Sequence, residues 1–281
     1  MSDIVYFSKK NWLNLFFIQQ LQALYNYRDF ILECVKREFQ SRYKTSMAGA
    51  AWLFLQPLAM ILVYTLIFSQ VMGSRLSGLE NNTFSYSIYL CSGLLAWTFF
   101  SDMLNRGQTL FTDNAHLLKK LKFPKICLLA IMVLATSLDF FIIFGIFLAF
   151  LLLSGNFPGW AFLSFFIVLL LQMLFAIGLG VTLGVLNVFF RDVKHFMSIV
   201  LQFWFWFTPV IYPIQALPDW ASHWLIFNPM FGVISAYHNI FLNSLWPDFT
   251  LLWPAALCAV FFCCLSLYLF RQHIADIVDE L

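Results

Sequence analysis

Histidine is the side chain that most often serves acid–base catalysis and metal binding near neutral pH, and this chain has five of them. They lie far apart, and none has a second ligand at the spacing of a metal site. His223 and His238 fall in a stretch that we predict to face outward, where they could serve a membrane acyltransferase. More commonly, histidines in such a stretch are simply polar residues at the membrane interface. Because nothing resembles a catalytic triad either, we expect no catalytic residue and no metal ligand.

Nucleotide phosphates are commonly held by a glycine-rich loop, and no G-x-x-x-x-G-K-[ST] sequence is present. We therefore expect no nucleotide and no other cofactor on this chain. The 16 Lys and Arg residues nearly balance the 14 Asp and Glu residues. Binding of nucleic acid through bulk positive charge is therefore excluded.

One acidic residue, Asp139, lies in the middle of a long apolar stretch. An ionised group is costly inside a membrane, so such a residue needs an explanation. We expect a structural role for it, either paired with a group on another helix or protonated. A proton relay is disfavoured because no second intramembrane acid or base lies nearby in the sequence.

The elements that carry these residues are strongly hydrophobic. Hydrophobic residues make up 62% of the chain and charged residues 11%, against about 45–50% and about 25% in soluble proteins. So little polar surface cannot cover a soluble globule of this length. The alternating ten-residue segments of a transmembrane barrel are missing. The sequence therefore predicts an all-α polytopic membrane protein in contact with membrane lipids.

A helix needs about 20 mostly apolar residues to cross the hydrocarbon core, and six stretches of this chain meet that requirement. We expect a cytoplasmic amino-terminal region at residues 1–49, one transmembrane domain at residues 50–270 and a cytoplasmic tail at residues 271–281. The six predicted spans are Ala50–Met72, Tyr86–Met103, Ile126–Leu153, Trp160–Phe190, Phe196–Tyr212 and Phe249–Phe270.

Lys and Arg residues set the orientation, because cytoplasmic segments carry them in excess. Seven lie in the amino-terminal region and five in the loop Leu104–Lys125; Arg191, Lys194 and Arg271 follow the fourth and sixth spans. The only one elsewhere is Arg75. This bias predicts that both termini are cytoplasmic.

Three segments outside the spans have recognisable patterns. Between Tyr27 and Lys44 apolar residues recur at helical spacing opposite a charged face, which predicts an amphipathic helix on the cytoplasmic membrane surface, either an anchor or a moving gate. The loop Leu104–Lys125 is predicted to hold a short helix capped by Asp113 or Asn114. Its basic cluster suits docking onto another protein, although it can also merely enforce topology.

The third segment, Trp224–Trp246, is apolar and free of Lys, Arg, Asp and Glu, so a seventh span is conceivable. The Asn228-Pro229 pair and several polar residues interrupt it, and proline disrupts a helix interior. We therefore predict a hairpin of short helices that dips into the outer leaflet.

An ordered set of motifs resembles the type-2 ABC exporter permeases for polysaccharides. The run Arg37–Trp52 with Gln56-Pro57 is similar to the family's opening signature R-E-x-x-x-R-Y-x-x-S-x-L-G-x-x-W-x-x-x-x-P, with Ala48 where leucine is usual. The resemblance extends from about Arg28 to Phe270 and looks most like the O-antigen permease (Wzm) branch. The further matches are His116–Lys120 with Phe123-Pro124, Arg191-Asp192, Thr208–Pro213 and Asn228-Pro229.

The resemblance implies a homodimer of six-span subunits with two copies of a separate ATPase chain, which binds ATP and Mg. It further implies export of a lipid-linked polysaccharide of the O-antigen type across the bacterial cytoplasmic (inner) membrane. Capsular polysaccharide or teichoic acid is a second possible cargo. The sequence is also compatible with a drug or lipid exporter on the same scaffold and, less well, with a membrane glycan acyltransferase.

The resemblance also implies roles for particular segments. The helix Arg28–Lys44 would be a cytoplasmic gate, with candidate residues Arg28, Arg37, Glu38, Arg42 and Tyr43. A coupling helix around Asn105–Leu118 would sit on the ATPase, and Leu217–Leu245 would form short outer gate helices between spans five and six. The candidate coupling residues are Asn105, Arg106, Leu110, Asp113, Asn114, Leu117, Arg191 and Asp192.

A path for a polysaccharide needs flat apolar surfaces for the sugar rings and few fixed charges, which aromatic side chains provide. The fifth predicted span carries the aromatic run Phe203–Phe207. Aromatic residues also form interface belts and fill packing gaps, so a polymer path remains a hypothesis. Its candidate residues are Tyr64, Trp204, Trp206, Phe207 and Tyr212.

Overall fold

The computed structural model describes residues 22–43, 84–120, 123–214 and 217–273, together with positions 55, 59, 62, 63 and 280. Every regular element in these ranges is a helix, which confirms the predicted all-α class. Four positions excepted, the first predicted span Ala50–Met72 lies outside the described residues, and with it the candidate path residue Tyr64.

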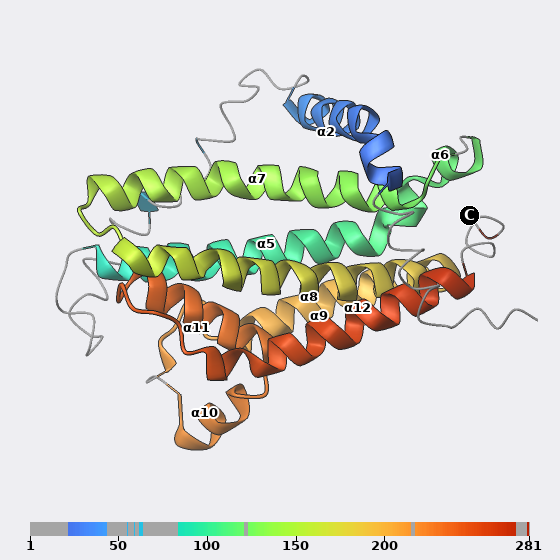
Figure 1. Cartoon of the computed structure of the whole chain (residues 1–281). Coiled ribbons are helices and arrows are strands. Elements are labelled where there is room, and N and C mark those ends of the chain that lie inside the picture. The colour runs from blue at the N-terminus through green and yellow to red at the C-terminus, as the bar shows by residue number, and fades with distance from the viewer. Residues whose placement is uncertain are drawn as a thin grey trace, which may run out of the picture.

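Four described helices are long and apolar enough to cross a membrane, so the chain is a multi-pass membrane protein. They are α5 (Ser85–Asp113), α7 (Ile126–Leu153), α8 (Phe162–Phe189), which follows the short 3₁₀ helix η2 (Gly159–Ala161), and α12 (Trp253–His273), which follows η4 (Phe249–Leu252). They run alongside one another (Figure 1). At about 1.5 Å per residue, 28 residues rise about 42 Å, more than the hydrocarbon core of about 30 Å.

The second predicted span, Tyr86–Met103, lies within α5, but the helix continues beyond it at the carboxyl end. The sequence places a loop after Met103, whereas α5 continues as a helix to Asp113. Leu104, Leu110 and Phe111 in this continuation are buried in the bundle core, and their burial stabilises the extra helical turns. The amide of Asn114 then donates to the carbonyl of Leu110 at 2.8 Å, and the predicted short helix is reduced to α6 (Ala115–Lys120).

The fifth predicted span, Phe196–Tyr212, is not helical to its predicted end, because α9 (Val193–Trp206) covers only 14 residues. That length rises about 21 Å and does not reach across the hydrocarbon core. After Trp206 the chain turns through Phe207–Tyr212. Proline at position 209 has no N–H to donate, so the helix does not continue there.

The segment after α9 forms two short helices, α10 (Asp219–Leu225) and α11 (Pro229–Phe241). The predicted break at Asn228-Pro229 is therefore confirmed, and a continuous seventh span is not formed. The side chain of Asn228 caps α11 by accepting from the Met230 backbone N–H at 3.0 Å, and proline occupies the first turn, where its missing N–H is tolerated. α11 packs against α5, α8 and α12.

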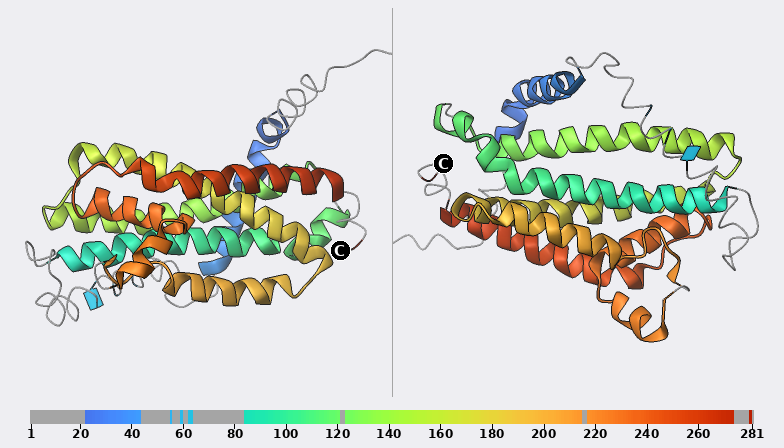
Figure 2. Two further views of the ribbon diagram at one scale, coloured as in Figure 1. Left: turned by 90° about the horizontal axis from the view of Figure 1, so that it is seen from below. Right: turned by 180° about the vertical axis from the view of Figure 1, so that it is seen from behind.

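The predicted amphipathic helix is present as α2 (Arg28–Tyr43). Ile31 and Val35 on one side of it are buried against Cys127 and Ala135 of α7. The view from below in Figure 2 shows α2 crossing the direction of the long helices. That α2 lies on the membrane surface remains a prediction.

α8 packs against both α5 and α12, and glycines allow the closest approaches. A Cβ atom on Gly184 would lie 2.5 Å from the Gly107 carbonyl oxygen of α5, and one on Gly178 would lie 2.7 Å from the Cys263 backbone nitrogen of α12. Small residues at helix contacts are a common way to bring helices together in a membrane. These glycines therefore set the spacing of the central helices.

The carboxyl ends of α5, α8 and α12 lie at one end of the bundle, together with α6 and the start of α7 (Figures 1 and 2). Ring contacts between Phe111 and Phe270 and between Phe189 and His273 join these ends. Lys125, Arg191 and Arg271 therefore fall at the same end of the molecule, which agrees with a common cytoplasmic side.

Candidate functional site

Three charged side chains from three helices meet where α2 crosses α5 and α7. The guanidinium of Arg106 on α5 donates to Glu38 Oε1 on α2 at 3.1 Å and to Asp139 Oδ2 on α7 at 2.5 Å. We call these three residues the ion cluster. The side chains of Arg106 and Asp139 are only 24% and 20% exposed, so the bond between them is largely shielded from water.

The ion cluster decides between the two states expected for Asp139. Its pairing across helices is confirmed, since its carboxylate bonds to a base 33 positions away in the sequence. The partner could not be found from neighbouring residues, because helix packing alone brings α5 and α7 together. An ion pair also explains how an ionised group is tolerated in an apolar helix.

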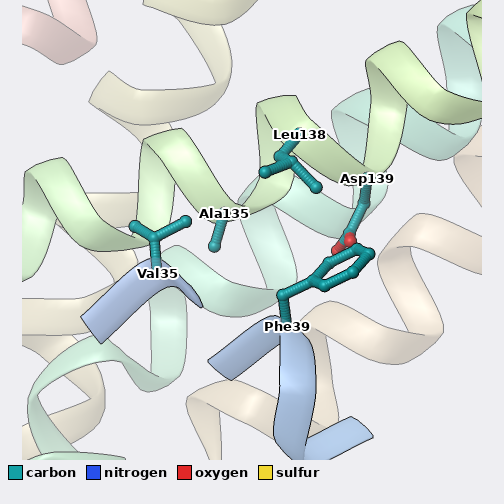
Figure 3. A pocket seen from close by; sticks show the side chains of 5 residues that line it. All are labelled: Val35, Phe39, Ala135, Leu138 and Asp139. Carbon is teal, nitrogen blue, oxygen red and sulfur yellow. The ribbon is translucent and has the colours of Figure 1, made fainter. Parts of the chain in front are cut away.

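A shallow pocket adjoins the ion cluster between α2 and α7. Val35 and Phe39 of α2 and Ala135, Leu138 and Asp139 of α7 line it. The Phe39 ring and the Asp139 carboxylate point toward one another across it (Figure 3). The contact between α2 and α7 therefore contains an apolar part and, next to it, the charged side chains of the ion cluster.

The other candidate gate residues do not join the ion cluster. Arg28 and Arg37 are exposed on α2, and the Arg28 guanidinium lies over the ring of Tyr25, 4.6 Å from its centroid. Arg42 and Tyr43 belong to α2, and their side chains lie outside the described part of the structure. Glu38 is therefore the candidate gate residue with a described contact to the bundle.

Burial raises the pKa of the Cys34 thiol on α2; the nearby Arg37 opposes this rise, and Glu33 and Glu38 add to it. Burial also lowers the pKa of the Lys125 amine just before α7. The Cys34 thiol therefore stays protonated near neutral pH and is no reactive nucleophile. In the described ranges no three His, Cys, Asp or Glu side chains gather in a way that could hold a metal ion.

The candidate coupling residues divide into exposed and buried ones. Asn105 and Asp113 on α5 are exposed, as are Arg191 and Asp192 in the turn between α8 and α9, whereas Leu110 is buried in the core. Asn114 and Leu117 are half-buried around α6. The view from behind in Figure 2 places α6 and the α8–α9 turn at the same end of the bundle. Contact with another protein through these residues remains a prediction.

The candidate path residues also divide. Trp206 and Phe207 are exposed at the end of α9, at 59% and 69%. Trp204 instead points into the bundle, where its ring packs edge-on against Phe100 and its indole N–H donates to Asn228 Oδ1 at 2.8 Å. These contacts favour a positioning role for Trp204.

Tyr212 belongs to a polar junction that holds the turn after α9. Its hydroxyl donates to the Trp206 carbonyl at 2.7 Å, and the hydroxyl of Tyr89 on α5 donates to the Tyr212 carbonyl at 2.7 Å. The Asn228 amide donates to Thr208 Oγ1 at 2.9 Å. The turn is therefore tied to α5, α9 and the start of α11.

Sequence reasoning missed a second buried polar connection, between α5, α8 and α11. The Tyr237 hydroxyl donates to Gln172 Oε1 at 2.9 Å, and the Gln172 amide donates to the Ala96 carbonyl at 2.6 Å. Both side chains are fully buried. A lone glutamine within a long apolar run is a signal for such a partner, because an unpaired amide is costly in lipid.

Known proteins resemble this chain along most of its length. The sequence profile of the ABC-2 type transporter family matches residues 30–242. The O-antigen export system permease protein RfbA of Myxococcus xanthus is 33% identical over 233 residues, which cover 82% of this chain and 87% of the relative. A protein of the same description from Klebsiella pneumoniae is 27% identical over 217 residues, covering 77% and 81%.

A more distant relative is the polysialic acid transport protein KpsM of Escherichia coli. It is 21% identical over 199 residues, which cover 70% of this chain and 75% of the relative. The family profile alone spans well over half of the chain and includes the ion cluster, α9 and α11. The chain therefore belongs to the ABC-2 type transporter family.

Proposed function

We propose that this chain is the permease subunit of an ATP-driven exporter that moves a lipid-linked polysaccharide of the O-antigen type across the bacterial cytoplasmic membrane. The observation that carries the proposal is the 33% identity, over 82% of the chain, to an O-antigen export permease. Four long apolar helices supply crossings of the membrane. The basic end of the bundle, seen among its described residues, supports a cytoplasmic location for both termini.

An acyltransferase that uses His238 is disfavoured by the surroundings of this side chain. The histidine, on α11, is 9% exposed, and its ring stacks on Tyr89 with the two centroids 3.8 Å apart. A catalytic base must reach its substrate, and His238 is enclosed by the bundle. Export of capsular polysaccharide is the second candidate, supported by the more distant similarity to KpsM.

A separate ATPase chain would supply the energy, with ATP and Mg bound on that chain, two copies per complex. The surface proposed to receive it consists of α6 and the exposed residues Asp113, Arg191 and Asp192 at the basic end of the bundle. A second copy of the permease would complete the transport path. Exposed aromatic side chains at the end of α9, Phe203, Trp206 and the following Phe207, offer a surface that suits sugar rings.

Deleting the gene in its host, followed by analysis of surface and intracellular glycan, tests the function. We expect full-length lipid-linked polymer inside the cell and none on the surface. Complementation with the unmodified gene controls for effects on neighbouring genes. Unchanged surface polymer would exclude polysaccharide export, and polymer that reaches the surface undecorated would support the acyltransferase instead.

A further inference from the structure

α2 contacts the bundle through an apolar patch and through an ion pair between Glu38 and Arg106. Its buried apolar side chains, Ile31 and Val35, meet small groups of α7, Cys127 and Ala135, and Phe30 adds a ring contact to Phe123 at 5.7 Å. The bond from Arg106 to Glu38 adds a charged connection to this apolar contact and joins α2 to a second helix, α5.

Arg106 lies on the helix that leads to the proposed ATPase surface. It lies seven positions before the end of α5 at Asp113, which corresponds to about 10 Å along the helix. The segment between them is a continuous helix, and Leu110 and Phe111 pack it into the core. A displacement at the α5 end is therefore carried to Arg106 by a rigid element.

Arginine suits a connection to two acids at once, because its planar guanidinium presents several donors in fixed directions. Nη1 bonds to Glu38 and Nη2 to Asp139, so one side chain holds α2 and α7 together. Without the arginine, two carboxylates would remain near each other in a shielded place, where like charges repel strongly. A polar connection between α2, α5 and α7 therefore runs through this base.

We propose that Arg106 is a positioning residue that couples α2 to the ATPase-facing end of α5 through Glu38, so that movement there shifts α2 during transport. This proposal rests on the proposed export function. It assigns Arg106 a role inside the permease, in place of the contact with the ATPase that the family resemblance implies. It also assigns Glu38 the role of the residue through which α2 is moved by Arg106.

The test uses the full permease in complex with its ATPase and compares Glu38→Gln with Glu33→Gln. Both substitutions neutralise one carboxylate on α2, but Glu38 bonds to Arg106 whereas Glu33 pairs with the exposed Lys36. We expect Glu38→Gln to keep ATP hydrolysis within twofold of the unmodified complex while surface polysaccharide falls at least fivefold. Glu33→Gln should change neither quantity by more than twofold. A purely structural role would lower the amount of complex and its ATPase activity together.

Hydrogen–deuterium exchange of the same complexes reports on α2 directly. We expect faster exchange at residues 28–43 in Glu38→Gln and in Arg106→Lys, whose single ammonium lacks the planar fork, and unchanged exchange in Glu33→Gln. Unchanged α2 exchange in Glu38→Gln, or loss of export in Glu33→Gln to the same extent, would overturn the proposal. Absence of polysaccharide export by the unmodified chain would instead overturn the proposed function, whatever the exchange shows.

Discussion

At the scale of single residues, polar side chains inside apolar helices have identifiable partners. Asp139 pairs with Arg106, and Gln172 pairs with Tyr237 and the Ala96 carbonyl. Such connections stabilise the bundle at defined points, since lipid offers no hydrogen bonds in compensation. Their loss should therefore be measurable as a loss of stability.

The loss of stability on breaking the ion cluster should depend on which residue is replaced. Asp139→Asn leaves Arg106 paired with Glu38, whereas Arg106→Gln leaves two carboxylates without their base, so we expect Arg106→Gln to be the more destabilising. Removing one partner of a buried pair costs about 3–5 kcal/mol. With Arg106 and Asp139 24% and 20% exposed, we expect about 1–3 kcal/mol for Asp139→Asn.

Thermal unfolding in detergent, followed by size-exclusion chromatography, measures this difference. The double variant Arg106→Gln/Asp139→Asn is the control and should lose less stability than the sum of the single variants. Additive losses would show that the two side chains do not interact.

The two tryptophans near the end of α9 should behave differently. Trp204→Ala removes a ring packed against Phe100 and the bond to Asn228. Such a change typically costs about 3–5 kcal/mol at a fully buried site, and Trp204 is half-buried, so we expect a smaller loss of stability and a reduced amount of folded protein in the membrane. Trp206→Ala changes an exposed ring and should leave the amount of protein unchanged while lowering surface polysaccharide. Equal protein amounts for both variants would contradict the positioning role of Trp204.

At the scale of elements, helix length and helix spacing have separate causes. The core packing of Leu110 and Phe111 extends α5 beyond its apolar stretch, and Pro209 lies in the turn that ends α9 early. Glycines set how closely α8 approaches α5 and α12. Of these causes, only proline is recognisable from local sequence alone.

Gly184→Leu should force α5 and α8 apart. Its Cβ atom would lie 2.5 Å from the Gly107 carbonyl oxygen, and backbone cannot yield as a flexible side chain can. We expect loss of most monodisperse protein on size-exclusion chromatography. Gly145→Leu on α7 is the matched control, because a Cβ atom there meets nothing within 4 Å. A full yield of Gly184→Leu would mean that the helices are not in close contact.

At the scale of the whole molecule, the bundle has one basic end and one end without Lys or Arg among its described residues. α6, the α8–α9 turn and the last turn of α12 lie at the basic end. The loop after α11 lies at the other, where Phe241 contacts Phe147 near the end of α7. Such a separation predicts that the two ends face opposite sides of the membrane.

Cysteine labelling in intact cells measures this orientation. We expect a membrane-impermeant maleimide to label Asn243→Cys from outside, and Arg191→Cys only after the cells are permeabilised. The unmodified chain, with its own six cysteines, gives the background labelling. Labelling of Arg191→Cys in intact cells would reverse the proposed topology.

Much of this architecture follows from the sequence itself. The predicted and observed limits of α7 are the same, Ile126–Leu153. The sequence also predicts an amphipathic helix between Tyr27 and Lys44, observed as Arg28–Tyr43, and the break at Asn228-Pro229. These features depend on local properties, namely the length of an apolar stretch, the spacing of apolar residues and the missing N–H of proline. Such properties can be read from neighbouring residues without knowing the tertiary structure.

Tertiary structure alone decided the rest. Arg106 meets Glu38 and Asp139 across sequence separations of 68 and 33 residues, and no local pattern encodes such a meeting. The same holds for Trp204, whose aromatic neighbours suggest an exposed path although its ring is packed inward. Which face of a uniformly apolar helix meets protein is decided by packing, because hydrophobicity is similar on every side.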